Sequence, residues 1–380
     1  MKARQSTVTV ALLVCAAALL LALLFATRVA HKMPDFGVYW TAASRARAAE
    51  PLYRSEDGHY QFKYLPAFAI LTMPLAAMPL QIAKAMWFVA SVVLVMALVS
   101  LSLAVLPERR KARWLLVTLT LVVMLKFYGH ELVLGQMNVL FGVAVAGAVV
   151  AIRRGREGMA GVLMALAIVV KPYAVIFLPW LLARRQSASI GAAAIGTAAS
   201  VTLPALRYGV AGDIELHRAW WKTVTESTGP NLTNADNVSI AAMWTKWIGA
   251  GPEATAMTAV TSAVVLAAAV FVFVRRRRVP FPEGLEAALL LTCIPLLSPQ
   301  GWDYVFLVST PAIVFVVNYE DLLPPFVRVP ALAALLTIGV SVYDLIGRAA
   351  YGTFMALSVI SVCYFVVVAA LCTLRARGVA

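Results

Sequence analysis

Long apolar runs separated by short polar connections dominate the chain. Runs of about 20 residues, such as 8–27 and 254–274, are long enough as helices to cross a hydrocarbon core of about 30 Å. The pattern predicts an all-α, polytopic membrane protein that forms a single domain over residues 1–380. We expect about twelve spans, at about 8–28, 82–106, 114–129, 137–152, 158–170, 173–183, 188–206, 254–274, 284–297, 303–318, 329–346 and 351–374.

Two of the expected spans, 158–170 and 173–183, are short for a straight crossing, and Lys171-Pro172 separates them. Proline lacks an N–H and disfavours helix at the residue before it. Non-helical backbone at membrane depth is tolerated only against protein or a water-filled cavity. We therefore predict that the chain turns here and that Lys171 faces a cavity, where a phosphate would supply the anion that a buried cation requires.

Two longer polar segments, 29–81 and 207–253, are expected to form loops on one side of the membrane. The first contains Asp35 and the apolar stretch 65–79, which three prolines interrupt, so it predicts short helices lying at the membrane interface. The second is rich in tryptophan, a residue that suits the headgroup level.

The composition supports membrane insertion, and the charge distribution predicts an orientation. The chain is 62% hydrophobic and 13% charged, against about 25% charged in an ordinary globular protein. The net charge of +14 does not indicate nucleic-acid binding, because the basic residues cluster in short connections, at 109–113, 153–156, 184–185, 275–278 and 375–377. Short loops rich in Lys and Arg stay in the cytoplasm.

Placing these loops and both termini inside leaves a net charge of +12 on the inner side and +2 on the outer side. The pattern thus predicts a multi-pass protein of the inner (plasma) membrane whose two polar segments face the periplasm. A cleaved signal peptide is the alternative for the first run, because Lys2 and Arg4 precede it. Its apolar core is longer than the usual stretch of about 7–15 residues, and Arg28 does not fit the cleavage pattern, which favours a retained span.

The cysteines and histidines do not predict a metal centre. All four cysteines lie within apolar runs, which argues against a disulfide framework or a thiolate site, and the four histidines show no pair spaced by four residues; these residues are Cys15, Cys293, Cys363, Cys372, His31, His59, His130 and His217. We expect neither a metal nor a cofactor.

Asp35 is the candidate for acid–base chemistry, because it follows the first span directly. A carboxylate beside a membrane cavity can take the proton of an attacking hydroxyl. A solvated loop aspartate or a helix N-cap is the structural alternative. The nearby candidates for binding a phosphate are Lys171, Lys63 and Arg207, whose alternative role is to reach toward lipid headgroups.

Polar residues at three further turns could contact a sugar. Gln136 and Asn138 open a helix and either cap it or bind sugar hydroxyls or phosphate. Asp303, after Trp302 in a Pro/Gly turn, is either a helix cap or a second carboxylate near Asp35. Asn237 belongs to a sequence that matches the N-glycosylation sequon.

An ordered set of short motifs over about residues 30–310 resembles glycosyltransferase family 87, the polyprenyl-phosphate-sugar-dependent enzymes of the C-type fold. The motifs are Asp35-Phe36, Tyr39-Trp40, Pro51-Leu52-Tyr53, Phe62-Lys63-Tyr64-Leu65-Pro66, Pro74-Leu75, Pro79, Gly135-Gln136-Met137-Asn138, Gly161 to Lys171-Pro172, Asn237-Val238-Ser239, Ser298-Pro299 and Trp302-Asp303-Tyr304.

The resemblance implies an outward-facing enzyme that moves a sugar, with mannose expected, from a polyprenyl phosphate to a hydroxyl of a glycolipid or glycan with inversion and without metal. It implies that Asp35 is the general base. We expect the donor and its phosphate to contact Lys171, Lys63, Arg207, Gln136 and Asn138, and the acceptor or sugar to contact Tyr39, Trp40, Tyr64, Asn237, Trp302 and Asp303. Where some family mannosyltransferases carry histidines after the Ser-Pro turn, this chain has Tyr304 and Val305.

Two other classes fit part of the pattern. A lipid or solute transporter or flippase would also have many spans and broken helices, but such proteins usually show repeated halves and ionisable groups at the membrane midplane. An O-antigen ligase or polymerase-like enzyme would share the many spans and a large outer loop. The absence of a nucleotide-binding glycine loop in the sequence agrees with a donor that is a lipid.

Overall fold

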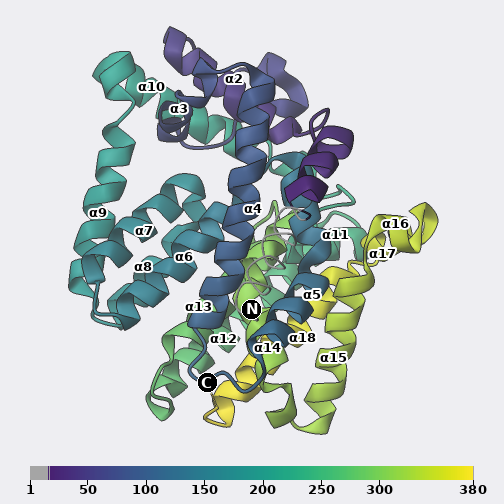
Figure 1. The fold of residues 1–380 in the computed structure, drawn as a ribbon. Coiled ribbons are helices and arrows are strands. Elements are labelled where there is room, and N and C mark those ends of the chain that lie inside the picture. The colour runs from purple at the N-terminus through teal and green to yellow at the C-terminus, as the bar shows by residue number, and fades with distance from the viewer. Residues whose placement is uncertain (1–15, 17, 380) are drawn as a thin grey trace, which may run out of the picture.

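The computed structural model describes residue 16 and residues 18–379, and this part of the chain consists of helices joined by turns and loops (Figure 1). Strands are absent from these residues, and an isolated antiparallel bridge joins Asn237 to Trp302. The helices on which the site depends are α2 (Pro34–Ala48), α3 (Pro66–Thr72), α4 (Leu80–Ala104), α5 (Arg113–Leu134), α6 (Asn138–Arg153), α7 (Glu157–Val170), α8 (Phe177–Ala183), α9 (Ser187–Thr202) and α10 (Ala205–Glu226).

The second half of the chain completes the bundle. Its helices are α11 (Ile240–Ile248), α12 (Pro252–Val274), α13 (Glu283–Leu297), α14 (Thr310–Tyr319), α15 (Pro325–Val340), α16 (Tyr343–Ile346), α17 (Arg348–Ala356) and α18 (Val359–Ala376). Shorter 3-10 segments include η2 (Ser55–Tyr60), η4 (Pro172–Ile176), η6 (Arg275–Arg278) and η7 (Asp303–Ser309).

Five of the described helices are long and apolar enough to cross a membrane. They are Leu80–Ala104, Arg113–Leu134, Pro252–Arg277, Asp303–Leu322 and Val359–Ala376, and counting the bent pair α9 and α10 as one span gives six. Shorter apolar helices such as Asn138–Arg153 and Glu157–Val170 lie beside them. The all-helical membrane architecture is confirmed, whereas the expected number of about twelve spans is not.

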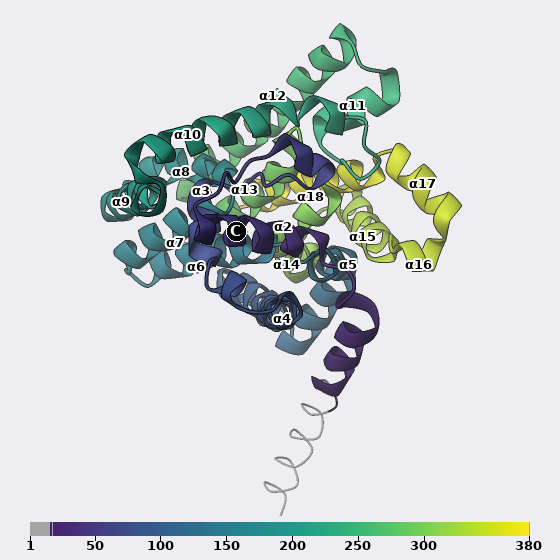
Figure 2. The ribbon, with the colours of Figure 1, turned by 90° about the horizontal axis from the view of Figure 1, so that it is seen from above.

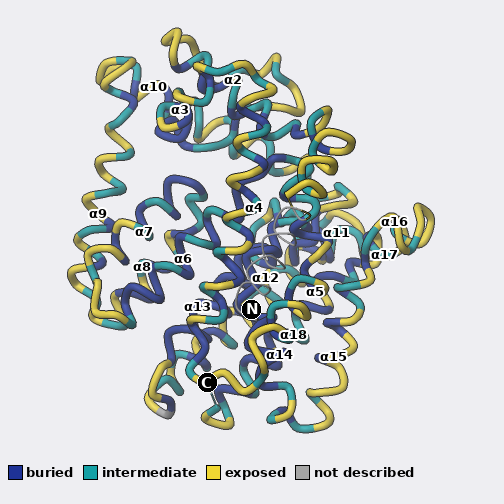
Figure 3. Tube along the Cα trace, in the orientation of Figure 1, coloured by how far each residue is buried: buried dark blue, intermediate teal, exposed yellow. Residues whose placement is uncertain are grey.

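The core of the bundle forms around α13 and α14. Every residue of α14 is buried, as is nearly every residue of α13, and α5, α6, α12 and α18 pack around them. Figure 3 shows the buried residues concentrated in this centre and the exposed ones on peripheral elements such as α9, α10 and α16. One face of α4 exposes large apolar side chains, as suits contact with lipid: Ile82, Met86, Val89 and Val93.

The bundle has two chemically distinct ends. At one, which we call the basic end, the connections rich in Lys and Arg meet: Lys111 pairs with Glu320, and Arg153 donates to the carbonyl of Ala104. At the other, which we call the site end, α2 lies across the bundle with α3 and α10 beside it (Figures 1 and 2). This grouping of the basic connections is the one that the charge pattern predicts.

Several expected boundaries are wrong. Helix α5 continues to Leu134, beyond the expected end of its span at 129, because the polar residues after 129 still face protein. The expected span 329–346 ends at Val340, and the expected span 351–374 is divided at Ser358, whose φ of 52° stops the helix.

The segment 207–253 is more helical than a loop. It contains α11 and most of α10, and the pair of helices made of α9 and the segment starting at Ala205 is bent by 88°. The expected short helices of the stretch 65–79 are present as α3 and a 3-10 turn at Leu75–Ala77. The first run, 8–28, lies partly outside the described residues, and its described part ends in the helix Ala18–Val29.

Candidate active site

The start of α2 fixes the position of Asp35. Pro34 occupies the first helical position, where an N–H would have no partner within the helix, so proline is tolerated there. Asp35 follows in the first turn. The backbone N–H of Met33 donates to the carbonyl of Val133 at 2.9 Å, which joins the start of α2 to the end of α5. Asp35 is therefore anchored to the bundle and does not move with a free loop.

Gly135 allows the turn between α5 and α6 to approach α2 closely. Its φ is +71°, a conformation that favours glycine, and a Cβ built there would lie 2.7 Å from the Cβ of Phe36. The turn ends α5 and carries Gln136 to the carboxylate of Asp35. A larger residue at position 135 would push these two segments apart.

Gln136 is at the centre of a buried hydrogen-bond network. Its Nε2 donates to Oδ2 of Asp35 at 2.7 Å and lies 3.4 Å from the hydroxyl of Tyr304. Its Oε1 accepts from the hydroxyls of Tyr39 at 3.0 Å and Tyr64 at 3.1 Å. These residues come from α2, the segment before α3, the α5–α6 turn and η7, so the network depends on the whole fold of the site end.

Lys171 joins this network through Tyr64. Helix α7 ends at Val170, and Lys171 is extended at φ −145° and ψ 102°, so the break expected before Pro172 is present. The Nζ of Lys171 donates to the Tyr64 hydroxyl at 2.9 Å and lies 4.6 Å from the centre of that ring. Neutral groups therefore separate the lysine cation from the Asp35 carboxylate.

The electrostatic setting of Asp35 favours proton uptake. Burial raises the pKa of Asp35 above the ordinary 3.8, because a partly dehydrated site opposes the charged form. The hydrogen bond from Gln136 and the positive charges of Lys171 and Lys63 oppose this rise. Burial likewise lowers the pKa of Lys63, while the charge of Asp35 acts in the other direction. The site can hold a carboxylate that accepts a proton more readily than a solvated one.

Asp303 does not join the Asp35 network directly. It is 1% exposed and lies 2.9 Å from Nζ of Lys126 and 3.4 Å from Nδ1 of His130. The ring of Tyr351 covers the Lys126 ammonium at 4.8 Å. The link to the Asp35 network is Tyr304, the next residue in the chain.

Asn138 also lies beside the main network. Its Nδ2 donates to Oε2 of Glu131 at 3.0 Å, and the N–H of Val139 donates to the other oxygen of Glu131 at 2.8 Å. Glu131 thus caps the start of α6, and Asn138 braces the cap. The charges of Glu131 and Asp35 both act on Lys171.

Four other residues expected at the site serve the scaffold. Arg207 donates to the carbonyls of Ala46 and Arg47 and so attaches α10 to the end of α2. Trp40 donates to a carbonyl of the segment before α4 at 3.2 Å. Asn237 bonds the carbonyls of two loops, and its backbone pairs with that of Trp302, so these two residues tie the segment before α11 to the turn before η7.

Two cavities lie beside α2. One of about 390 Å³ is lined by His31, Lys32, Pro34, Val133 and Leu134. The other, of about 380 Å³, is lined by residues of α2 and η2 with Phe62 and Leu80, and Pro34 borders it too. Asp35 lines neither cavity, although its neighbour Pro34 lines both. Among the described residues, no three His, Cys, Asp or Glu side chains are grouped to hold a metal ion.

The sequence profile of glycosyltransferase family 87 matches residues 62–299, more than half of the chain. The chain belongs to glycosyltransferase family 87. It is therefore a membrane glycosyltransferase, with a sugar donor and an acceptor as its substrates. No curated protein and no solved structure gave a significant match.

The family 87 match covers only part of the candidate site. Lys63, Tyr64, Gln136 and Lys171 lie within it, whereas Asp35 precedes its first residue by 27 positions. Asp303 and Tyr304 follow its last residue. The place of Asp35 in the site thus depends on the geometry, and above all on its bond to Gln136.

Three polar residues of this family 87 protein were not among the site residues expected from the sequence. Lys126 lies inside an expected span, and His130 and Glu131 lie just beyond its expected end, so their contacts could not be read from the apolar pattern. A lysine within an apolar run was the available signal, because such a charge requires a partner.

Proposed function

We propose that this family 87 enzyme transfers a sugar, with mannose expected, from a polyprenyl phosphate donor to a hydroxyl of a glycolipid or glycan, with inversion and with Asp35 as general base. The acceptor oxygen forms a bond to the anomeric carbon while its proton passes to Asp35. The bond between the anomeric carbon and the phosphate oxygen breaks, and its electron pair leaves with the polyprenyl phosphate.

The observation that supports this proposal most is the network that joins Asp35, Gln136, Tyr64 and Lys171. It brings a proton acceptor and a cation into one partly dehydrated site, where charges act strongly. A lipid-linked phosphate is already a good leaving group, so the enzyme needs one base and cations that stabilise the departing phosphate. The charges of Lys171, His59 and Lys63 act on Asp35, and the two lysines are the candidates for the phosphate.

The proposed sidedness depends on the same arrangement. The connections rich in Lys and Arg lie at the basic end, and Asp35 lies at the site end with α2 (Figure 1). Because short basic loops stay in the cytoplasm, the proposed transfer takes place on the outer, periplasmic side of the inner membrane.

The experiment is a transfer assay with the purified full chain in liposomes. The donor is radiolabelled polyprenyl phosphate mannose in one arm and the sugar nucleotide in the other, and the acceptors come from a lipid extract of a strain that lacks the gene. We expect labelled product from the polyprenyl phosphate donor alone, with an anomeric configuration opposite to that of the donor by NMR. Asp344→Asn, at an exposed position of α16, is the matched control and should keep full activity.

Product from the sugar nucleotide alone, or product with retained configuration, would contradict the proposal. A second arm replaces mannose by arabinofuranose on the same lipid phosphate. Preference for that donor would change the sugar and leave the rest of the proposal intact.

A further inference from the structure

The side chain of Gln136 uses all four of its hydrogen-bond positions on protein groups. A carboxamide can donate two bonds and accept two. Here Nε2 faces Asp35 and Tyr304, and Oε1 faces Tyr39 and Tyr64. Gln136 is 6% exposed. A phosphate oxygen or a sugar hydroxyl could bind this amide only by displacing one of these partners, which differs from the donor-binding role that the sequence suggests.

The charges at the two ends of the network fix the orientation of the amide. Lys171 can only donate, so the Tyr64 oxygen accepts its bond. The two tyrosine hydroxyls lie 2.6 Å apart, so at most one of them donates to the other, and at least one donates to Oε1 of Gln136. Nε2 therefore points to the carboxylate, because turning the amide over would place Oε1 against Asp35. The bonds run from a cation to an anion and polarise one another.

The two oxygens of Asp35 consequently differ. Oδ2 accepts the bond from Gln136, whereas Oδ1 has no hydrogen-bond partner among the described residues. Protein does not fully enclose Oδ1, so solvent reaches it. The oxygen that is free to take a proton is the one that a substrate can approach.

We propose that Gln136 is a positioning residue for the transfer reaction: it holds Oδ2 of Asp35 and thereby presents Oδ1 to the acceptor hydroxyl. Tyr39 and Tyr64 keep the amide in place, and Lys171 keeps the tyrosine hydroxyls turned toward it. This inference rests on the proposed role of Asp35 as the base. Small displacements of a reacting group can lower a rate about 100-fold, so a residue that only orients the base still has a large effect.

The test compares two substitutions that remove the bond in different ways, measured in the polyprenyl phosphate transfer assay. Gln136→Leu keeps the approximate size and loses both donors, and we expect kcat to fall by about 10-fold to 100-fold with a much smaller change in the KM for the donor. The acid limb of the kcat profile should move to higher pH, because the lost N–H bond favours the ionised carboxylate. Gln136→Glu should move that limb further, since it adds a like charge.

Gln300→Leu is the matched control. This carboxamide donates to the hydroxyl of Thr228 at 2.9 Å, away from Asp35, so its loss should leave kcat and the acid limb unchanged. The thermal unfolding temperature of each variant shows whether it is folded. Gln136→Asn serves as a second variant if Gln136→Leu does not fold, and its shorter side chain should give a change in the same direction.

Three outcomes would overturn the inference. An unchanged acid limb with a lower yield of folded protein would make Gln136 structural. A higher KM for the donor with unchanged kcat would give it a donor-binding role. Normal kcat in Gln136→Leu, together with an inactive Asp35→Asn, would show that Gln136 does not position the base, while the role of Asp35 would stand. Full activity in Asp35→Asn would instead remove the proposed base itself, so the two failures are distinguishable.

Discussion

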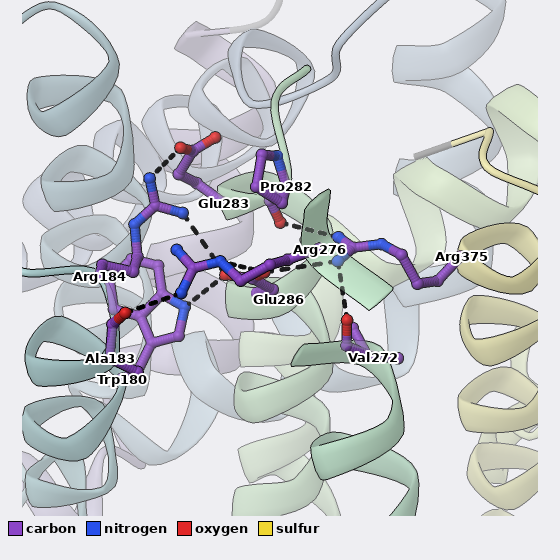
Figure 4. Close-up of polar contacts among 9 residues, drawn as sticks. All are labelled: Trp180, Ala183, Arg184, Val272, Arg276, Pro282, Glu283, Glu286 and Arg375. Atoms are coloured by element: carbon purple, nitrogen blue, oxygen red, sulfur yellow. Dashed lines mark hydrogen bonds and ion pairs between the residues drawn. The ribbon is translucent and has the colours of Figure 1, made fainter. Parts of the chain in front are cut away.

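The two ends of the bundle hold their buried charges in opposite ways. At the basic end, Glu286 is fully buried and faces cations directly: Nη1 of Arg375 at 3.4 Å, Nη1 of Arg184 at 3.5 Å and Nε of Arg276 at 3.7 Å (Figure 4). At the site end, Asp35 and Lys171 have opposite charges but contact each other only through Gln136 and Tyr64.

The basic-end cluster joins elements that are distant in the sequence. Arg184 follows α8 and also pairs with Glu283 at the start of α13, and Arg375 of α18 bonds the carbonyls of Val272 and Pro282 (Figure 4). The indole N–H of Trp180 donates to Glu286 at 2.8 Å. The cluster thus fastens the end of α8 to α13 and α18.

The comparison separates a structural arrangement of charge from a reactive one. At the basic end, the guanidinium groups of three arginines surround the Glu286 carboxylate, and each arginine comes from a different segment of the chain. At the site end, burial raises the pKa of the Asp35 carboxylate. Neutral groups separate this carboxylate from Lys171, so it can still take up a proton. The basic end thus uses buried charge to join helices, whereas the site end keeps its carboxylate apart from the nearest lysine.

The basic end should show the largest effect on stability. Glu286→Ala leaves Arg375 and its neighbours without their buried anion, and removing one partner of a buried ion pair destabilises by about 3–5 kcal/mol. We expect a strongly lowered thermal unfolding temperature in detergent, with little change in kcat for the protein that remains folded. Glu215→Ala is the control, because that glutamate is exposed and should be neutral. A Glu286→Ala protein as stable as the wild type would contradict the structural role of the charge cluster at the basic end.

Gly135→Ala should affect both stability and activity. The φ of +71° and the approach to Phe36 both oppose a Cβ, and backbone strain of this kind costs about 1–3 kcal/mol. The turn would shift and carry Gln136 away from Asp35, so kcat should fall as well. Gly158→Ala, where a Cβ meets nothing within 4 Å, is the matched control. Unfolding temperature and kcat measured on the same sample would check both effects.

Lys171→Met should weaken the use of the donor. The substitution keeps the length of the side chain and removes the cation near Asp35, and we expect kcat/KM for the polyprenyl phosphate donor to fall about 10-fold to 100-fold. The KM for the acceptor should change less. Lys222→Met, at an exposed position of α10, should have no effect. Equal losses for donor and acceptor would argue against a phosphate role for Lys171.

The smallest expected effect is on the pH dependence of kcat, and the direction of this effect is specific. The pKa of Asp35 is raised by burial, so Asp35 keeps its proton to a higher pH than an ordinary aspartate and kcat should decline on acidification at a pH above 3.8. A raised folded-state pKa also means that stability falls as pH rises through it. The stability difference between Asp35→Asn and the wild type should therefore favour the variant more at neutral pH than at acidic pH. An acid limb at or below 3.8 would contradict this.

Part of this arrangement could be predicted from the sequence. The apolar runs predicted the helical membrane architecture, and Pro172 correctly predicted the end of the helix just before Lys171. The aspartate after the first run and the turn at Gly135-Gln136 were singled out separately, and the fold brings them together. Local patterns suffice for such features because each depends on a few neighbouring residues.

The buried ion pairs could not be predicted. Arg184, Arg276 and Arg375 fit the pattern of cytoplasmic loop charges, yet they surround a buried glutamate. Lys126 and Asp303 are 177 positions apart, and their contact depends on how α5 packs against η7. The expected twelve spans are not confirmed for a related reason: a short apolar helix inside a bundle and one that crosses a membrane can have the same composition.

The most direct test of the reactive site is the kcat of Asp35→Asn in the polyprenyl phosphate transfer assay, with unfolding measured on the same sample. We predict a loss of at least about 100-fold, the usual contribution of a general base, in a protein no less stable than the wild type at neutral pH. Asp57→Asn, which removes the carboxylate paired with Arg45, should stay active. A kcat within a few-fold of the wild type in Asp35→Asn would contradict the assignment of Asp35 as the base.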